Sequence, residues 1–296
     1  MPFMQISIDL GAQDPAAAED ACFEHGALSV TLADAADHPV LEPAPGTTPL
    51  WPSVRLTALF PGDADGPALA AQLARSLSLP PERLAPEVVE DRQWEREWLK
   101  DFRPMRFGRR LWICPGGQAA PDPDALVLEL DPGLAFGTGT HPTTALCLEW
   151  LDAAAPLGGT VLDYGCGSGV LALAALRLGA AGACAVDIDP QALLATRQNA
   201  ARNGLEHRLV VTAAEELRDG AWDIVLANIL AGPLVELAPQ LAGYCRAGGD
   251  IVLAGMLEPQ AEDVAAAYGP WFDMHMFSNR EGWAVLSGRK RLPQAR

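Results

Sequence analysis

The sequence predicts an α/β protein in which a small α+β domain precedes a larger domain built on a doubly wound parallel sheet. Three observations predict this architecture. Apolar runs alternate with helical patterns at regular spacing from residue 160 onward, as strands and helices do around a parallel sheet. A glycine-rich turn directly follows the first of these runs, as in sheets that bind nucleotides. Residues 1–90 follow a different order, βαββαβ, which is that of a ferredoxin-like sandwich.

The small domain is expected to span residues 1–91. Alternating apolar residues predict its strands, and helical patterns that end at Gly26 and before Pro80 predict two helices. Residues 33–50 are rich in Ala, Asp, Pro and Gly and are expected to form a loop. The expected strands are 3–10, 28–32, 54–60 and 85–90, and the expected helices are 15–25 and 67–79.

Residues 92–115 are expected to connect the two domains. This segment carries three tryptophans and much of the local basic charge, and aromatic residues interleaved with arginine also occur where proteins bind single-stranded nucleic acid. Trp94 and Trp98, however, stand four residues apart on one face of a predicted helix, which is typical of packing. We therefore favour a helix and a strand that dock the domains, and we expect no direct contact with nucleic acid.

The larger domain is expected to span residues 116–296. An unusual loop, residues 130–144, crowds glycines and threonines at the entry to a helix that runs to about Leu151. A threonine early in a helix often bonds only the local backbone. Amides exposed at a helix start also bind anions or carboxylates, so contact with a ligand is the functional alternative.

The glycine-rich turn reads Asp163-Tyr-Gly-Cys-Gly-Ser-Gly169 and follows a short apolar strand. Glycine at every second position allows a sharp turn and lets a ligand approach the backbone without meeting a Cβ atom. The nicotinamide fingerprint Gly-x-Gly-x-x-Gly is disfavoured because Val170 stands at its last position. The sequence instead resembles the first motif of S-adenosylmethionine-dependent methyltransferases. A strand–helix turn without a ligand is the alternative.

A second strand ends in Asp187-Ile-Asp189-Pro190. Asp187 lies 18 residues after Gly169, close to the offset of roughly 20 residues at which a carboxylate binds the ribose diol of a nucleotide. Asp189 directly precedes a helix with proline in its first turn and is expected to cap that helix. Asp187 is therefore the predicted cofactor carboxylate.

The larger sheet is expected to close with an antiparallel pair of strands. Two strand-like runs, 271–277 and 283–287, flank a turn at residues 279–282. Seven strands with such a terminal pair form the methyltransferase variant of the Rossmann-like fold. The other expected strands lie near 160–163, 183–187, 208–212, 222–227 and 249–254, with helices between them.

Asn228 directly follows the fourth strand of this sheet. The carboxyl ends of strands at the switch point are where doubly wound sheets bind ligands. A helix cap or a turn residue is the structural alternative for Asn228. Because two cofactor motifs precede it at the proper strand interval, we favour the functional interpretation.

Length, composition and cysteine usage limit the class of protein. With 296 residues, of which 49% are hydrophobic and 20% charged, the chain can bury a large core. Its longest apolar stretch, residues 170–181, is too short to span a bilayer, and the N-terminus has no secretory signal pattern. The six cysteines form no Cys-x-x-Cys pair, which predicts reduced thiols and no metal site. We expect a cytoplasmic protein without membrane contact.

The net charge of −17 is concentrated near the N-terminus, where residues 1–95 hold 15 acidic residues against 4 arginines. Such a field repels the phosphate backbone of nucleic acids and attracts basic proteins or peptides. Acidity that only keeps the protein soluble is an equal alternative.

With these motifs in place, the chain resembles the ribosomal protein methyltransferase A family, bacterial enzymes that methylate large-subunit ribosomal protein eleven. The resemblance covers most of the chain, and its N-terminal segment matches more loosely. It is most specific in Leu134-Ala-Phe-Gly-Thr-Gly-Thr-His-Pro-Thr-Thr144, in Asp163–Gly169, in Asp187-Ile-Asp-Pro190 and in Asn228-Ile-Leu-Ala-Gly-Pro233.

The resemblance implies an S-adenosylmethionine-dependent protein methyltransferase. It implies a ferredoxin-like domain that captures the ribosomal protein, and methylation of lysine ε-amines and of the N-terminal α-amine, with up to three methyl groups each. The acidic N-terminal domain is consistent with a basic ribosomal substrate. The implied cofactor contacts are Thr144, Gly165, Gly167, Asp187 and Asn228.

Asn228 is also the candidate catalytic residue. A free lysine amine has a pKa of about 10.4, and burial in a site with few charges lowers it. We hypothesise that the Asn228 side chain, or the backbone carbonyls of Asn228 and Ile229, accept hydrogen bonds from the amine and direct its lone pair. His141 is a candidate for orientation or proton transfer, and a histidine that only packs the loop is an equal alternative.

Three alternatives remain at this stage. An enzyme of the same fold that methylates another protein or a small amine is the main one, although a small substrate would not need the N-terminal domain. A nucleic-acid methyltransferase is disfavoured, because the two prolines and the aromatic residue that follow Asn in many base-amine methylases are absent here. A cofactor-binding sensor without activity is the third. We expect the protein to be a monomer.

Overall fold

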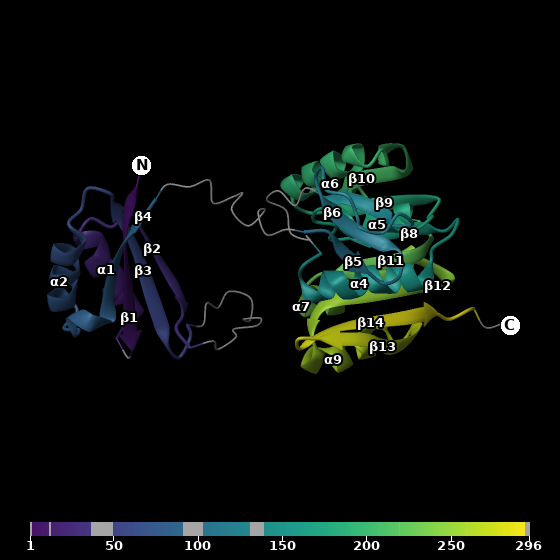
Figure 1. The fold of residues 1–296 in the computed structure, drawn as a ribbon. Coiled ribbons are helices and arrows are strands. Elements are labelled where there is room, and N and C mark those ends of the chain that lie inside the picture. Colours follow the sequence, from purple (N-terminus) through teal and green to yellow (C-terminus); the bar gives the residue numbers. More distant parts are fainter. Residues whose placement is uncertain are drawn as a thin grey trace. The chain divides into compact units, whose positions relative to one another are not determined.

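The structure, a computed structural model, describes residues 2–11, 13–36, 50–90, 103–130, 139–218 and 220–293. The chain divides into two compact units, Met1–Trp94 and Glu95–Arg296, and Figure 1 shows the ribbon of each. The docking helix that we predicted from Trp94 and Trp98 lies outside the described residues.

The first unit is a four-stranded antiparallel sheet with two helices. Its strands stand in the order β2-β3-β1-β4, so that β1 pairs with both β3 and β4. The element order βαββαβ is that of a ferredoxin-like sandwich. The elements are β1 (Phe3–Gly11), α1 (Pro15–Glu24), β2 (Ser29–Asp34), β3 (Val54–Pro61), α2 (Gly66–Ser76) and β4 (Leu84–Val89).

Helices α1 and α2 lie on one face of this sheet (Figure 1), and the core forms between them and the strands. Successive side chains of a strand point to opposite faces, so every second residue of β1 enters the core. Asp14 and Asp65 cap the two helices by accepting hydrogen bonds from Ala16 N and Ala68 N, both at 3.1 Å. The buried residues of β1 are Met4, Ile6, Ile8 and Leu10.

Helix α2 ends at Ser76, before the predicted end at Leu79. Ser78 adopts the left-handed conformation with φ of 53°, and Leu79 N donates a hydrogen bond to Ala74 O at 2.9 Å. This closure uses the carbonyls that the last turn leaves without partners. The apolar pattern continued past the helix because Leu77 and Leu79 remain buried after the backbone has turned.

The second unit begins with a small three-stranded sheet, formed by β5 (Met105–Phe107), β6 (Leu111–Pro115) and β7 (Leu126–Leu130). Strands β5 and β6 fall within residues 92–115, which we expected to connect the domains. Phe107, Leu111 and Ile113 are buried in the same cluster as Leu148 of α4 (Pro142–Ala154). The described part of the expected connection therefore contributes to the core of the second unit.

The main sheet of this unit has seven strands in the order β10-β9-β8-β11-β12-β14-β13. Neighbours from β10 to β12 run parallel, and β14 runs antiparallel to both of its neighbours. The predicted α/β, Rossmann-like fold class is confirmed. The strands are β8 (Thr160–Tyr164), β9 (Gly182–Asp187), β10 (Leu209–Ala213), β11 (Trp222–Asn228), β12 (Cys245–Leu257), β13 (Phe272–Arg280) and β14 (Trp283–Lys290).

Helices cover both faces of this sheet, so its central strands are buried on both sides. Val161 of β8 packs in one apolar cluster with α4 and α5, and the next residue, Leu162, packs in a second cluster with α7, α8 and α9. None of the helices in the described ranges combines the length and the apolar character needed to cross a membrane. The further helices are α5 (Val170–Arg177), α6 (Pro190–Arg202), α7 (Ala231–Glu236), α8 (Ala238–Tyr244) and α9 (Ala261–Tyr268).

The prediction of a helix between every pair of strands was wrong at one place. Between β10 and β11 the described residues form a single 3₁₀ turn, Ala214–Glu216. Residues 214–221 are too few for a helical crossover, which takes about a dozen residues. The sheet face beside this turn is partly uncovered, and Val210 of β10 is 59% exposed.

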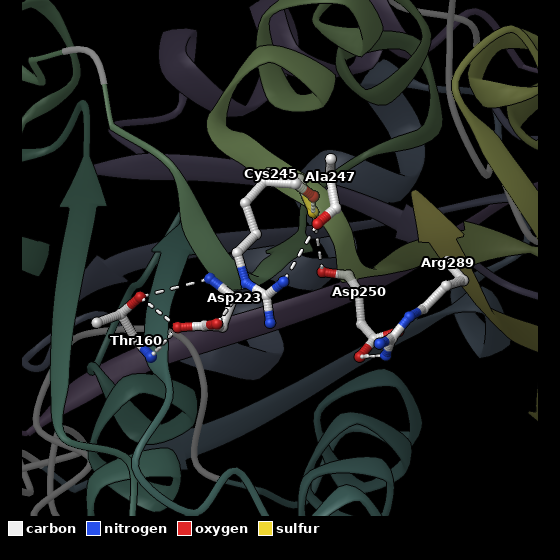
Figure 2. Close-up of polar contacts among 7 residues, drawn as sticks. Thr160, Asp223, Cys245, Ala247, Asp250 and Arg289 are labelled. Atoms are coloured by element: carbon white, nitrogen blue, oxygen red, sulfur yellow. Dashed lines mark hydrogen bonds and ion pairs between the residues drawn. The ribbon is translucent and has the colours of Figure 1, made fainter. Parts of the chain in front are cut away.

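A network of polar contacts links the amino-terminal ends of β8, β11 and β12 (Figure 2). Asp223 Oδ2 accepts hydrogen bonds from Thr160 N at 2.7 Å and Thr160 Oγ1 at 2.8 Å, and Asp223 Oδ1 accepts one from Arg246 Nε. The backbone hydrogen bond from Thr160 is the main reason why the pKa of Asp223 is lowered. The network links the starts of β8, β11 and β12. Because these three strands run parallel, their carboxyl ends lie together at the opposite edge of the sheet.

All six cysteines are buried and unpaired. Burial is the main cause that raises the pKa of each thiol, to about 11 for Cys22 and Cys184 and to about 12 for Cys245. The folded protein therefore holds these residues as neutral apolar groups rather than as reactive thiolates.

Candidate active site

The glycine-rich turn leaves β8 at the carboxyl edge of the sheet. Gly165, Gly167 and Gly169 all have positive φ angles, of 82°, 53° and 79°, which glycine adopts without a steric penalty. A Cβ atom on Gly165 would lie 2.3 Å from Ile229 Cγ2, and one on Gly169 would lie 2.7 Å from Thr196 Cγ2. Glycine is therefore required here both for the turn and for close packing.

Asp187 holds this turn from the end of β9. Its Oδ2 accepts a hydrogen bond from Gly167 N at 2.9 Å, and its Oδ1 accepts one from Asp189 N at 3.0 Å. A carboxylate oxygen can accept more than one hydrogen bond, so Asp187 can hold the turn and still bind a hydroxyl. Its role toward a cofactor remains a prediction. The predicted cap is confirmed, since Asp189 Oδ1 accepts from Gln191 N at 2.9 Å.

Two buried polar side chains of α6, which the sequence reasoning missed, hold the other side of the turn. Thr196 Oγ1 donates to Gly167 O at 3.0 Å, and Asn199 Nδ2 donates to Ser168 O at 2.9 Å. Thr196 and Asn199 stand three residues apart on the inward face of the helix. Polar residues at helical spacing on an otherwise apolar face were the available signal.

Asp163 lies fully buried beneath the turn. Its Oδ2 accepts a hydrogen bond from Ala172 N at 3.0 Å, whereas its Oδ1 has no hydrogen-bond partner among the described residues. Burial raises the pKa of Asp163 to about 7, against the lowering effect of the Ala172 hydrogen bond. The charged form is disfavoured because taking a carboxylate out of water costs several kcal/mol unless it is fully paired.

Asn228 and Thr144 meet at the same edge, although 84 residues separate them. Asn228 Nδ2 donates to Thr144 Oγ1 at 3.3 Å, so the end of β11 is joined to the first turn of α4. The residue after Asn228, Ile229, packs against Gly165. The predicted site residues therefore converge, through the contacts Asp187–Gly167, Asn228–Thr144 and Gly165–Ile229. Residues 131–138 of the predicted loop lie outside the described residues.

A pocket of about 370 Å³ opens beside Asn228. Gly255 of β12 forms part of its wall with φ of 90°, and a Cβ atom there would lie 2.3 Å from Ile229 O. None of the described lining side chains is acidic, and none is lysine or arginine, so the pocket suits a group that enters without its charge. The lining residues are His141, Thr143, Asn228, Ile229, Leu230, Gly255 and Trp283.

His141 occupies the entry to α4, where it caps the helix. Its Nδ1 lies 2.7 Å from Thr143 Oγ1 and 3.4 Å from Thr143 N. Its ring contacts that of Trp283 edge to face, with centroids 4.7 Å apart. Burial lowers the pKa of His141, against the raising effect of Glu281, and so favours the neutral form of the ring. These contacts favour a positioning role over proton transfer.

Ile188 follows Asp187 and is 83% exposed. An aliphatic side chain left in water beside a predicted ribose carboxylate offers an apolar surface for the flat face of a base. The sequence reasoning did not single it out, because an isolated exposed hydrophobic residue is common on protein surfaces.

These residues fit a nucleoside-bearing cofactor such as S-adenosylmethionine. Gly165, Gly167 and Gly169 form a cradle of backbone without side chains after β8, and the Asp187 carboxylate, which accepts a hydrogen bond from Gly167 N, stands at the same edge of the sheet. The uncharged pocket beside Asn228 lies next to that cradle, because Gly165 and Gly255 both contact Ile229. The arrangement can therefore hold a cofactor and a small reacting group side by side.

The family model described as ribosomal protein L11 methyltransferase (PrmA) matches residues 2–291 of the chain. A ribosomal protein L11 methyltransferase of Pseudomonas aeruginosa (strain LESB58) is 54% identical over 294 residues, which cover 98% of this chain and 99% of that protein. One of Pseudomonas fluorescens (strain Pf0-1) is 51% identical over 292 residues, which cover 98% and 100%.

Among solved structures, a ribosomal protein L11 methylase from Lactobacillus delbrueckii subsp. bulgaricus superposes with a TM-score of 0.59 at 32% sequence identity. The match covers 64% of this chain and 100% of that chain. The similarity in sequence therefore extends over both units, and the similarity in structure extends over 64% of the chain.

Replacement of Asp163 by asparagine tests the buried carboxyl. The folded-state pKa of Asp163 is raised to about 7, above the ordinary value of about 3.9. The folded state therefore binds the proton more tightly than the unfolded state does. As pH rises from about 4 to 7, this group lowers the free energy of unfolding. We expect the free energy of unfolding of Asp163→Asn to gain about 2 kcal/mol relative to wild type between pH 5 and pH 7. Urea unfolding without ligand measures it. Parallel pH profiles of the two proteins would show that Asp163 titrates normally.

Proposed function

The chain belongs to the ribosomal protein L11 methyltransferase family, and from this premise we propose that it methylates lysine ε-amines and the N-terminal α-amine of ribosomal protein L11. The protein is an S-adenosylmethionine-dependent methyltransferase. The family match over residues 2–291 carries the assignment, and the glycine cradle beside an uncharged pocket supports it.

For cofactor binding we assign Thr144, Gly165, Gly167, Asp187 and Asn228, the residues that the sequence predicted. The Asp187 carboxylate stands at the edge of the glycine turn, where it can accept hydrogen bonds from a ribose diol. The exposed side chain of Ile188 offers an apolar face for the adenine. The glycines let the amino-acid part of the cofactor approach the backbone.

S-adenosylmethionine supplies a methyl group that is already activated on a sulfonium. The protein therefore has to align a neutral amine with it. A lysine amine with a pKa of about 10.4 is almost entirely protonated at pH 7. Entry into a pocket whose described lining residues include no Asp, Glu, Lys or Arg lowers that pKa. In-line placement then adds the rate gain of proximity.

Asn228 directs the amine. Its Nδ2 donates to Thr144 Oγ1 at 3.3 Å, which turns the amide so that Oδ1 is left to accept a hydrogen bond from the amine. The backbone carbonyl of Ile229, held in place by Gly255, is a second acceptor in the same pocket. A hydrogen bond donated by the amine aims its lone pair away from the acceptor and toward the methyl donor.

The first unit selects the protein substrate. It is compact by itself, and the acidic excess of residues 1–95 attracts a basic ribosomal protein. The same acidity is unfavourable for nucleic acid. We also propose that the enzyme works in the cytoplasm, where its ribosomal substrate is made, and that it has no contact with the membrane. We further propose that it is a monomer.

The function is tested by methyl transfer from labelled S-adenosylmethionine to unmethylated ribosomal protein L11, followed by mass spectrometry of peptides. We expect mass gains in steps of one methyl group on lysine residues and on the N-terminus. Cofactor binding without transfer would leave the fold and the cofactor in place and would direct the search to another protein or a small amine.

Removal of the first unit tests its role in substrate selection. We expect residues 95–296 to bind S-adenosylmethionine like the full chain but to methylate ribosomal protein L11 with kcat/KM reduced by about 100-fold or more, because binding energy remote from the reacting groups is lost. Calorimetry and initial rates measure the two quantities. Normal methylation by the shortened protein would remove the proposed role.

Replacement of Asn228 by alanine tests the aiming role. We expect kcat/KM for the protein substrate to fall about 100-fold, because a misdirected amine loses the benefit of alignment. Gln240→Ala, which removes an exposed amide on α8, is the matched control and should behave as wild type. An Asn228→Ala enzyme that kept full kcat/KM with intact cofactor binding would show that the backbone alone aims the amine.

A further inference from the structure

Trp283 forms an aromatic wall of the pocket beside Asn228 and comes from a distant part of the chain. It is the first residue of β14 and pairs with Leu257 of β12. Its ring makes a T-shaped contact with the His141 ring, with 4.7 Å between the ring centroids. The indole is thus held against His141 in the pocket that the Asn228 amide also lines.

The turn that precedes Trp283 is fixed from two sides. Glu281 and Gly282 form the tight turn of the β13–β14 hairpin, with φ angles of 53° and 79°. Gly282 O accepts a hydrogen bond from Glu258 N at 2.8 Å, and Arg280 forms an ion pair with Glu149 of α4 at 3.0 Å. The indole therefore has a fixed position relative to Asn228, as a recognition element requires.

The lining of the pocket holds two kinds of group, which suit different forms of an amine. At Asn228 and Ile229, amide and carbonyl oxygens accept hydrogen bonds, which an unmethylated amine can donate. Each methyl group removes one N–H donor, and a fully methylated nitrogen has none. An aromatic face binds such a group through cation–π and dispersion contacts, and Trp283 supplies an aromatic ring in the same pocket.

We propose that Trp283 is a specificity-determining residue that lets the pocket hold an amine already carrying methyl groups, so that one nitrogen is methylated repeatedly. The proposal rests on the proposed function. In each transfer the lone pair of the amine forms a bond to the methyl carbon, the carbon–sulfur bond breaks with its electron pair going to sulfur, and S-adenosylhomocysteine leaves. A proton passes from nitrogen to solvent before the next transfer. The third transfer yields a quaternary ammonium that Asn228 cannot hydrogen-bond.

The test compares two forms of ribosomal protein L11 with the full-length enzyme. The first is unmethylated, and the second has been dimethylated on its amines by formaldehyde and borohydride, so that it reports only the last transfer. We expect Trp283→Leu to lose about tenfold more kcat/KM on the dimethylated form than on the unmethylated form, since the aromatic face no longer contacts the nitrogen that becomes a quaternary ammonium during the transfer. Trp283→Phe, which keeps an aromatic face, should retain most of the activity on both.

Trp271→Leu is the matched control. Trp271 packs against the apolar cluster that contains residues of α7, α8 and α9, and it does not line the pocket. Melting curves and cofactor calorimetry show whether each variant is folded, and Trp283→Met, which also removes the aromatic face, carries the test if Trp283→Leu does not fold. Equal losses of kcat/KM on both substrates for the variant without an aromatic ring at position 283, or no loss on either, would overturn the role of Trp283. A wild-type enzyme that methylates only the unmethylated form would overturn the inference alone, whereas one that methylates neither form would overturn the proposed function and the inference with it.

Discussion

The close approach of three backbone segments at the carboxyl edge of the sheet is the constraint on which the site depends. Gly165, in the turn after β8, and Gly255 of β12 both contact Ile229, and a Cβ atom on either glycine would lie 2.3 Å from an atom of Ile229. Ile229 is thus clamped between the turn after β8 and the wall formed by β12. Since Ile229 is covalently joined to Asn228, this clamp also fixes the amide that faces the pocket.

Hydrogen bonds from β9 and α6 make the glycine turn rigid from both of its sides. Asp187 accepts from the amide of Gly167, and Thr196 donates to the carbonyl of the same residue. The helix that carries Thr196 is itself capped by Asp189, only two residues after Asp187. One stretch of chain therefore both shapes the cradle and anchors the helix behind it, so that a substitution at Asp187 would affect both.

Sequence patterns predicted the features of the fold that depend on residues close together in the chain. The strands from 160 to 287, the Asp189 cap and the convergence of the predicted residues at one edge follow from side-chain periodicity and strand order. The early end of α2 and the missing helix after β10 did not follow, because backbone closure at Ser78 and the length of the crossover outweigh the apolar pattern. Trp283 was missed because its position in the pocket depends on the pairing of β14 with β12, which joins residues remote in sequence.

The six buried thiols give the protein resistance to oxidants and electrophiles. Only the thiolate reacts readily with peroxide or an alkylating reagent, and burial raises the pKa of Cys22 and Cys184 to about 11. Reaction then requires local opening of the fold. Cys22 belongs to the first unit and the other five cysteines to the second, so the rate at which each thiol is modified would measure how often its own unit opens.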